Sequence, residues 1–246
     1  MKKVYKNRSY RSLVSNKKLQ TFRVAVKETD LLVRAETPVE TETTDLVLKH
    51  RTPLERYIED NPDFVDRLTP LPHDPLAPPI VRTMIEAGQK AGVGPMAAVA
   101  GAVAEHVGRD LFAYSKEVII ENGGDIFIRT TFPVVVAIFA GSSPLSAKLG
   151  VRIDSQGTQM AVCTSSGTLG HSLSLGRADA AVVISESSAL ADAAATAIGN
   201  VVSNKADIAS AIRLGEKIDG VAGIVLIING QMGLWGKVEL VRLPQN

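Results

Sequence analysis

The order of the predicted elements indicates an α+β protein, in which helices pack on one side of mixed β-sheets. Two helix-rich stretches, residues 79–112 and 187–215, alternate with clusters of short apolar runs that are typical of strands. Of the 246 residues, 45% are hydrophobic and 22% are charged, which is enough apolar material for a substantial core. The chain has no internal repeat and no low-complexity linker, so we expect a single domain over residues 1–246.

The N-terminal third begins with predicted strands and continues with a helix. Alternation of apolar and polar residues predicts strands at Phe22–Val26 and Asp30–Ala35, joined by a short polar turn. Thr52-Pro53 has the form of a helix N-cap followed by a first-turn proline. We therefore expect a helix from this pair to about Asn61.

A proline-rich stretch divides the chain. Five of the twelve prolines lie within residues 69–79, which predicts an extended loop. We expect this loop to separate a peripheral β/helix layer, residues 1–78, from the core, residues 79–246. The core would begin with a helix that starts at Pro79 or Ile80 and ends near Lys90.

Gly92-Val93-Gly94 precedes a second predicted helix, which runs from Pro95 to about Phe112. Free amides at the start of this helix would favour a phosphate. Alternatively, the glycines cap the end of the preceding helix. Helix-boundary statistics favour the capping interpretation.

Strands dominate the prediction from Glu117 onward, with two further helices and a closing hairpin. The residues of Asp154–Gly157 are typical of a hairpin turn. A second hairpin is expected to close the chain, with Trp235 in the connection between its strands. The expected strands are Val118–Glu121, Asp125–Arg129, Pro133–Phe139, Leu149–Ile153, Gln159–Thr164, Ala180–Ile184, Ile224–Ile228 and Val238–Leu243, and the expected helices are Ser187–Ser203 and Asn204–Gly215.

Composition and charge exclude several classes of protein. The net charge of +1 and the aromatic fraction of 4% argue against a nucleic-acid partner or a membrane surface. Residues 1–27 hold nine basic and no acidic residues, which we interpret as lysines that protect a half-solvated edge strand. No apolar run reaches membrane-spanning length and no export signal is recognisable, so we expect a cytoplasmic protein.

The stretch from Glu121 to Ile126 is the first candidate binding motif. Gly123 and Gly124 can adopt positive φ, and their missing side chains let a ligand approach the backbone. Their amides could form a small anion-binding nest, with Asn122 and Asp125 as oriented polar groups at its rim. Asp125 could equally close the turn with its carboxylate, and we expect it to do both.

The second motif lies in the alanine-rich helical stretch Ala191–Thr196. Asp192 and Thr196 are four residues apart, so they share one face of a helix. A carboxylate and a hydroxyl side by side suit Mg²⁺, whose coordination phosphate oxygens can complete. The alternative is structural, with an acidic residue near a helix start and a threonine bonded to its own backbone.

Further candidates lie in one glycine-rich segment. Thr164, Ser165 and Ser166 follow a strand, where their hydroxyls and amides can bind phosphate or ribose. His171 lies in the same segment and could contact phosphate or transfer a proton, or bond to the backbone. Cys163 lacks an evident base and is expected to be a small buried residue.

These motifs together carry a family resemblance. Glu121–Ile126, then Cys163–Gly167, then Ala191–Asn200 resemble, in that order, the ApbE-like superfamily, whose best-known members are magnesium-dependent FAD:protein FMN transferases. The resemblance covers the core from about Gly94 to Asn200, and the N-terminal third resembles another branch of the superfamily. It implies an ApbE-like fold of two intimately associated subdomains.

By this resemblance, the site residues take specific roles. Gly123, Gly124 and Asp125 would contact FAD or a related flavin, and Asp192 and Thr196 would bind Mg²⁺. The chain departs from the transferases in two places: Ala100 stands where a lysine is expected, and His171 is the only histidine where the family has a histidine-rich segment. We therefore expect binding of a phosphate-bearing small molecule, with transferase or pyrophosphatase activity, a carrier or sensor role, or a different anionic substrate as the open alternatives.

Overall fold

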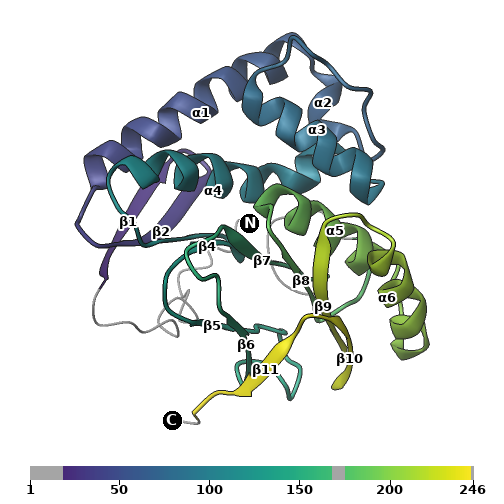
Figure 1. Cartoon of the computed structure of the whole chain (residues 1–246). Coiled ribbons are helices and arrows are strands. Elements are labelled where there is room, and N and C mark those ends of the chain that lie inside the picture. Colours follow the sequence, from purple (N-terminus) through teal and green to yellow (C-terminus); the bar gives the residue numbers. More distant parts are fainter. Residues whose placement is uncertain (1–18, 168–174, 245–246) are drawn as a thin grey trace.

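An eight-stranded antiparallel sheet with the strand order β1-β2-β3-β4-β7-β8-β9-β10 organises the protein (Figure 1). The computed structural model describes residues 19–167 and 175–244. The strands of this sheet are β1 Gln20–Val26, β2 Thr29–Ala35, β3 Val118–Asn122, β4 Asp125–Arg129, β7 Met160–Ser165, β8 Ala180–Ser185, β9 Val221–Ile228 and β10 Gln231–Gly236. A second, three-stranded sheet contains β5 Val134–Ala137, β6 Leu149–Ile153 and β11 Glu239–Arg242.

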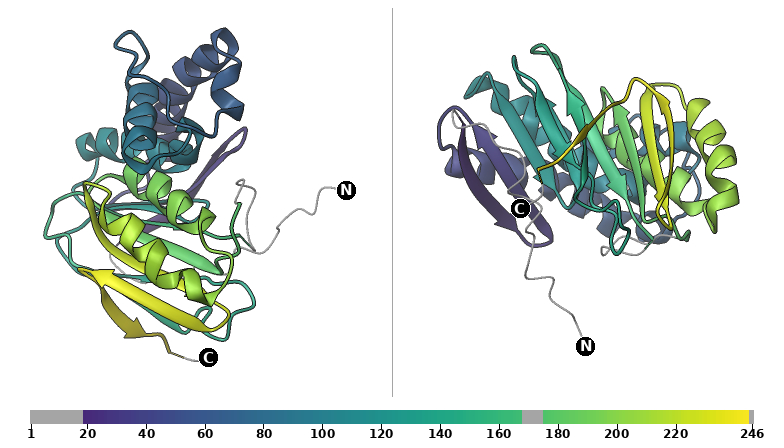
Figure 2. Two further views of the ribbon diagram at one scale, coloured as in Figure 1. Left: turned by 90° about the vertical axis from the view of Figure 1, so that its right-hand side faces the viewer. Right: turned by 90° about the horizontal axis from the view of Figure 1, so that it is seen from below.

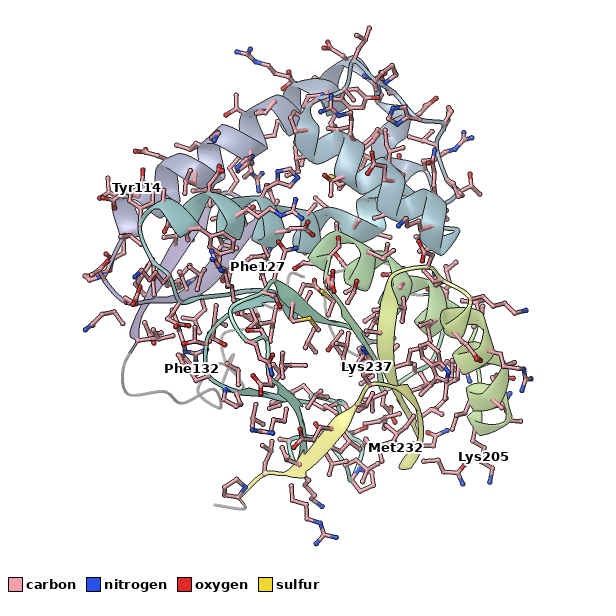
Figure 3. All side chains as sticks on the ribbon, viewed as in Figure 1. Tyr114, Phe127, Phe132, Lys205, Met232 and Lys237 are labelled. Atoms are coloured by element: carbon pink, nitrogen blue, oxygen red, sulfur yellow. The ribbon has the colours of Figure 1, made fainter. Side chains whose placement is uncertain are left out.

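The helices cover one face of the large sheet and the small sheet covers the other (Figures 1 and 2). Successive side chains along a strand point to opposite faces of the sheet, so the large sheet contributes to a core on each face. Val118 and Ile120 of β3 face the helices, whereas Ile119 between them faces the small sheet. Figure 3 shows Phe127 of β4 beneath α4, where a side chain on Gly108 would meet the Phe127 ring at 2.5 Å. The helices are α1 Glu40–Asp60, α2 Asp63–Asp66, α3 Pro79–Ala91, α4 Val99–Asp110, α5 Ser188–Asn200 and α6 Ile208–Glu216, with 3₁₀ turns at Pro95–Ala98, Leu111–Ala113 and Lys205–Asp207.

The α+β fold class is confirmed, although every strand pair among the described residues is antiparallel where mixed sheets were expected. β2 pairs with β3, so the first two strands extend the large sheet. The division into a peripheral layer and a core at residue 78 stays a prediction. None of the helices within the described ranges has the length and apolar character to span a bilayer.

The predicted start of the first long helix was wrong. Helix α1 begins at Glu40 and carries Pro53 in its interior. Thr43, Val47 and Leu54 are the buried residues of α1, and their helical spacing continues through the proline. Tertiary packing of this face therefore outweighs the local cost of an interior proline.

The predicted hairpins at Asp154–Gly157 and over residues 229–237 were also wrong. The turn at Asp154–Gly157 connects β6 with β7, which belong to different sheets. Trp235 lies in β10, which pairs with β9, and the chain then crosses to place β11 beside β6. Glycine spacing made residues 229–237 resemble a loop, but Gly233 accepts the close approach of Ile208 and Ile212 from α6.

His106 is a half-buried packing residue of α4. Its Nε2 lies 3.0 Å from the Thr83 hydroxyl of α3, and its ring centroid lies 5.1 Å from that of His50 on α1. The pKa of His106 is lowered to about 4. Burial is the largest cause, the charges of His50 and Arg109 also lower the pKa, and those of Glu105 and Asp110 oppose the shift. The imidazole is therefore neutral in the folded protein at neutral pH.

This environment predicts acid sensitivity in a defined range. The unfolded chain binds a proton on His106 with a pKa of about 6.5 and the folded chain only near 4, so the free energy of unfolding falls as the pH drops between these values. The loss amounts to about 3 kcal/mol at the acid end. Urea unfolding of wild type and His106→Gln at pH 7 and 4.5 measures it, because glutamine keeps a hydrogen bond to Thr83 without titrating. An equal loss in both proteins would contradict the prediction.

Candidate functional site

The Gly123-Gly124 pair forms a two-residue hairpin turn between β3 and β4. Asn122 pairs with Asp125, and the two glycines have φ values of 70° and 114°. Among the described residues, a Cβ built on Gly123 has no atom within 4 Å, and one on Gly124 meets only the Thr164 carbonyl oxygen at 3.7 Å. The turn therefore borders open space, as a backbone that a ligand approaches would require.

The amides of this turn are less available than the sequence indicated. The Gly124 N–H donates to the Glu121 carboxylate at 3.0 Å. An anion bound to the same amide would meet the negative charge of Glu121, so a nest made by both glycine amides does not fit this arrangement. Buried Arg34 on β2 interacts electrostatically with Glu121, which helps explain how a carboxylate is accommodated here.

The Asn122 side chain ties the turn to the helices. Its Nδ2 donates to the Ala100 carbonyl oxygen of α4 at 3.0 Å, and the residue is buried. Asn122 thus fixes the distance between the end of β3 and the start of α4. Sequence patterns gave it a place at the rim of the turn but could not reveal this contact.

Helices α4 and α5 cross at Gly101. A Cβ on Gly101 would meet the Ser188 carbonyl oxygen at 2.2 Å and the Asp192 Cβ at 2.9 Å, so only glycine fits. The Gly101 N–H donates to Asp192 Oδ2 at 2.9 Å, and the Ala100 amide also donates to this carboxylate. Asp192 therefore caps the first turn of the neighbouring helix, whose amides have no partner within α4.

The capping is reciprocal. Glu105 of α4 accepts hydrogen bonds from the Ser187 hydroxyl at 2.8 Å and the Ala189 amide at 3.2 Å, at the start of α5. Arg109 pairs with the other Glu105 oxygen at 2.6 Å. Each helix thus supplies a carboxylate to the N-terminus of the other, which the sequence analysis missed because only the fold brings these residues together.

Two carboxyls at this crossing are poorly solvated. The pKa of Asp125 is raised to about 7. Burial is the largest cause, contacts with Cys163 and Thr164 oppose the rise, and the charge of Glu121 adds to it. Burial also raises the pKa of Asp192 well above its usual range, and the Asp125 charge adds to the rise. No lysine or arginine of the described residues contributes to either shift. Burial therefore favours the neutral form of both carboxyls, so either a proton or a bound cation would neutralise their charge.

The remaining candidates lie around this point, with one exception. Thr196 is one turn after Asp192 on α5 and half-buried, and Thr164, Ser165 and Ser166 are half-buried at the end of β7, beside the glycine turn. Cys163 is buried, as expected, and burial raises the pKa of its thiol. His171 lies outside the described residues.

The alternative phosphate site at Gly92–Gly94 is not formed. Gly92 has a φ of 74° and caps α3, and the Gly94 amide donates to the Leu68 carbonyl oxygen at 2.9 Å. A groove of about 530 Å³ lies between the end of α3 and α6, lined in part by Lys90 and Arg213. Basic side chains near the C-terminal ends of helices are accounted for by the helix dipole.

The comparisons with known proteins agree with this fold. The sequence profile of the family described as "AbpE bacteria" matches residues 11–234. The chain belongs to this ApbE-like family. Relatives include the UPF0280 proteins of Methanocaldococcus jannaschii, 40% identical over 227 residues (89% of this chain and 92% of the relative), and of Methanocella arvoryzae, 41% identical over 223 residues (90% and 91%).

Solved structures of low sequence identity share the ApbE fold. A single-substitution mutant of the flavin transferase ApbE from Vibrio cholerae has a TM-score of 0.57 at 11% identity, covering 88% of this chain and 96% of that one. The ApbE protein from Thermotoga maritima has a TM-score of 0.55 at 12% identity, covering 90% and 96%. The resemblance inferred from the three motifs is thus confirmed for the family and the fold.

The capping role of Asp192 predicts a structural cost for its removal. Asp192→Ala leaves the Ala100 and Gly101 amides without an acceptor, so we expect a loss of about 1–3 kcal/mol in the free energy of unfolding. Asp192→Asn keeps an acceptor oxygen and should lose less. Urea unfolding of metal-free protein at pH 7 measures both, and an Asp192→Ala variant as stable as wild type would contradict the capping role.

Proposed function

We propose that this protein binds a phosphate-bearing flavin-type ligand, FAD or a close relative, together with Mg²⁺ held by Asp192 and Thr196. One observation carries the proposal: the buried carboxyl of Asp125 and the half-buried carboxyl of Asp192 have no lysine or arginine of the described residues among the causes of their pKa shifts, and Asp125 ends the glycine turn. In a family with the ApbE fold, such a site suits a divalent cation and an anionic ligand.

The donor set fits magnesium better than a transition metal. Within the described residues, no three His, Cys, Asp or Glu side chains are grouped for metal binding. A carboxylate, a hydroxyl and oxygen atoms of ligand or water are the partners that Mg²⁺ prefers. Asp192 is preorganised for this role, since the α4 amides already orient its carboxylate.

The ligand contacts follow from what surrounds the turn. The hydroxyls of Thr164, Ser165 and Ser166 would bind phosphate or ribose oxygens, with His171 as a further candidate contact. Gly123 and Gly124 would let the ligand approach the backbone of the turn, although Glu121 leaves Gly124 no free amide to offer. The phosphates are therefore expected nearer to β7 and α5 than to the Gly124 amide.

The chemistry that this site could support is cleavage or transfer across a pyrophosphate. Bound Mg²⁺ would supply the stabilisation of negative charge that the leaving phosphate needs. Asp192 and Thr196 would hold the metal, while Asn122 keeps α4 and the turn at a fixed distance. Ala100 offers no positive charge where the transferases carry lysine, which commonly costs about 10²–10³ in rate.

The loss of this positive group favours a second function, that of a non-catalytic flavin or nucleotide carrier or sensor. An enzyme that acts on a different small anionic substrate is the third alternative. Incubation of the purified protein with FAD and Mg²⁺ separates them. FMN and AMP release indicates an enzyme, a stable yellow complex indicates a carrier, and no binding of any flavin contradicts our proposal and favours the third.

We expect tight binding with slow or absent cleavage of FAD, and little covalent FMN on a threonine-containing acceptor protein. The reason is the pair of departures at Ala100 and around His171. Mass spectrometry of the acceptor after incubation with this chain, FAD and Mg²⁺ provides the measurement. Rapid, stoichiometric addition of FMN to the acceptor would contradict this expectation and would show that the protein is an active transferase.

A glycine substitution tests the ligand-facing role of the turn. Gly124→Ala places a Cβ in the open space beside Thr164 at a φ of 114°, so we expect at least a tenfold loss of FAD affinity with a modest loss of stability. Gly157→Ala is the matched control, because its φ is 78° and its Cβ would meet the nearest atom at the same 3.7 Å. Isothermal titration with FAD and Mg²⁺ measures both, and equal affinities would limit the turn to a structural role.

A further inference from the structure

Asp125 has an unsatisfied buried oxygen. The residue is 7% exposed, and its Oδ1 has no hydrogen-bond partner in the part of the chain that the structure describes. The Thr164 backbone and the Cys163 thiol are close enough to its carboxyl group to oppose the rise of its pKa, but the thiol of Cys163 donates to the Ser188 carbonyl oxygen at 3.4 Å. Because a buried carboxylate oxygen without a partner costs free energy, a native protein that keeps one has a use for it.

The position of Asp125 indicates what that use is. β4 begins at Asp125 and pairs with β7, and α5 packs on β7 and carries Asp192. Cys163 of β7 is buried and its Sγ lies 3.4 Å from the Ser188 carbonyl oxygen at the start of α5, and the charges of Asp125 and Asp192 both add to the rise in the pKa of its thiol. Because β4 as well as β7 contacts α5, Asp125 begins a strand that packs against the helix carrying Asp192 and Thr196.

We propose that Asp125 is a direct ligand of the divalent cation. The metal site then consists of two carboxylates and one hydroxyl, and it binds the cation before the phosphate-bearing ligand binds. This inference rests on the proposed function of the same site. A single carboxylate leaves Mg²⁺ dependent on substrate phosphates for most of its ligands. A second carboxylate balances the dipositive charge with two negative ones, so the metal can bind to the protein alone.

A purely structural role for Asp125 makes the opposite prediction for the metal-free protein. If its carboxylate only secures the turn through Cys163 and Thr164, its replacement by asparagine weakens those contacts and lowers the melting temperature. If it is a cation ligand, Asp125→Asn removes an uncompensated buried charge. The metal-free variant should then melt at a higher temperature than metal-free wild type at pH 8.

Titration of the metal-free full chain with Mn²⁺, followed by electron paramagnetic resonance without any flavin, tests the inference. We expect wild type to bind about one Mn²⁺ and Asp125→Asn to bind it at least tenfold more weakly. Asp110→Asn is the control, because Asp110 pairs with Lys49 and His50 at the other end of α4 and should leave the affinity unchanged. Added Mn²⁺ should raise the melting temperature of wild type more than that of Asp125→Asn.

Two results would overturn the inference: equal Mn²⁺ affinities of wild type and Asp125→Asn, or no Mn²⁺ bound by wild type until FAD is added. Either leaves the proposed function intact if wild type still binds FAD with Mg²⁺. Failure to bind FAD in the presence of Mg²⁺ would instead overturn the proposed function. A lower melting temperature of metal-free Asp125→Asn would show that the carboxylate is structural.

Discussion

The backbone contact between α4 and α5 at Gly101 is the constraint on which the candidate site depends. The missing side chain of Gly101 lets the two helices approach closely. The first turn of each helix can therefore reach a carboxylate of the other. Asp192 serves α4 and Glu105 serves α5. Asn122 then joins the same point to the end of β3. The helix caps thus form the site without any ligand, and the Asp192 and Asn122 side chains are held by hydrogen bonds to backbone atoms.

This assembly leaves an electrostatic imbalance. Glu105 is matched by Arg109, and Glu121 interacts with Arg34, whereas the pKa shifts of Asp125 and Asp192 include no contribution from a lysine or arginine of the described residues. Buried carboxyls without a positively charged partner lower stability, and strongly shifted pKa values of this kind are common at functional sites. Glu105 and Glu121 are thus structural, whereas we propose that Asp125 and Asp192 bind a cation, Asp192 in addition to its capping of α4.

Patterns in the sequence predicted the parts of this protein that local chemistry determines. All strands except β10, the glycine turn, the cap at Gly92 and the α+β class follow from periodicity and turn residues. The start of α1 and the partner of β11 did not follow, because the packing of Val47 and Leu54 and a crossover between sheets decided them. For the site, the motifs located Asp125 and Asp192, but the bonds from Gly101 to Asp192 and from Gly124 to Glu121 join residues through geometry that spacing does not reveal.

The most direct test of the central claim is the position of the cation itself. A crystal structure of the protein with Mn²⁺ and FAD, recorded at a wavelength where manganese scatters anomalously, locates the metal without assumptions about activity. Our account predicts one anomalous peak at ligand distance, about 2 Å, from oxygens of Asp192 and Thr196, with flavin phosphates beside it. A fully occupied peak elsewhere, with the Asp192 carboxylate bonded only to the α4 amides, would contradict the account.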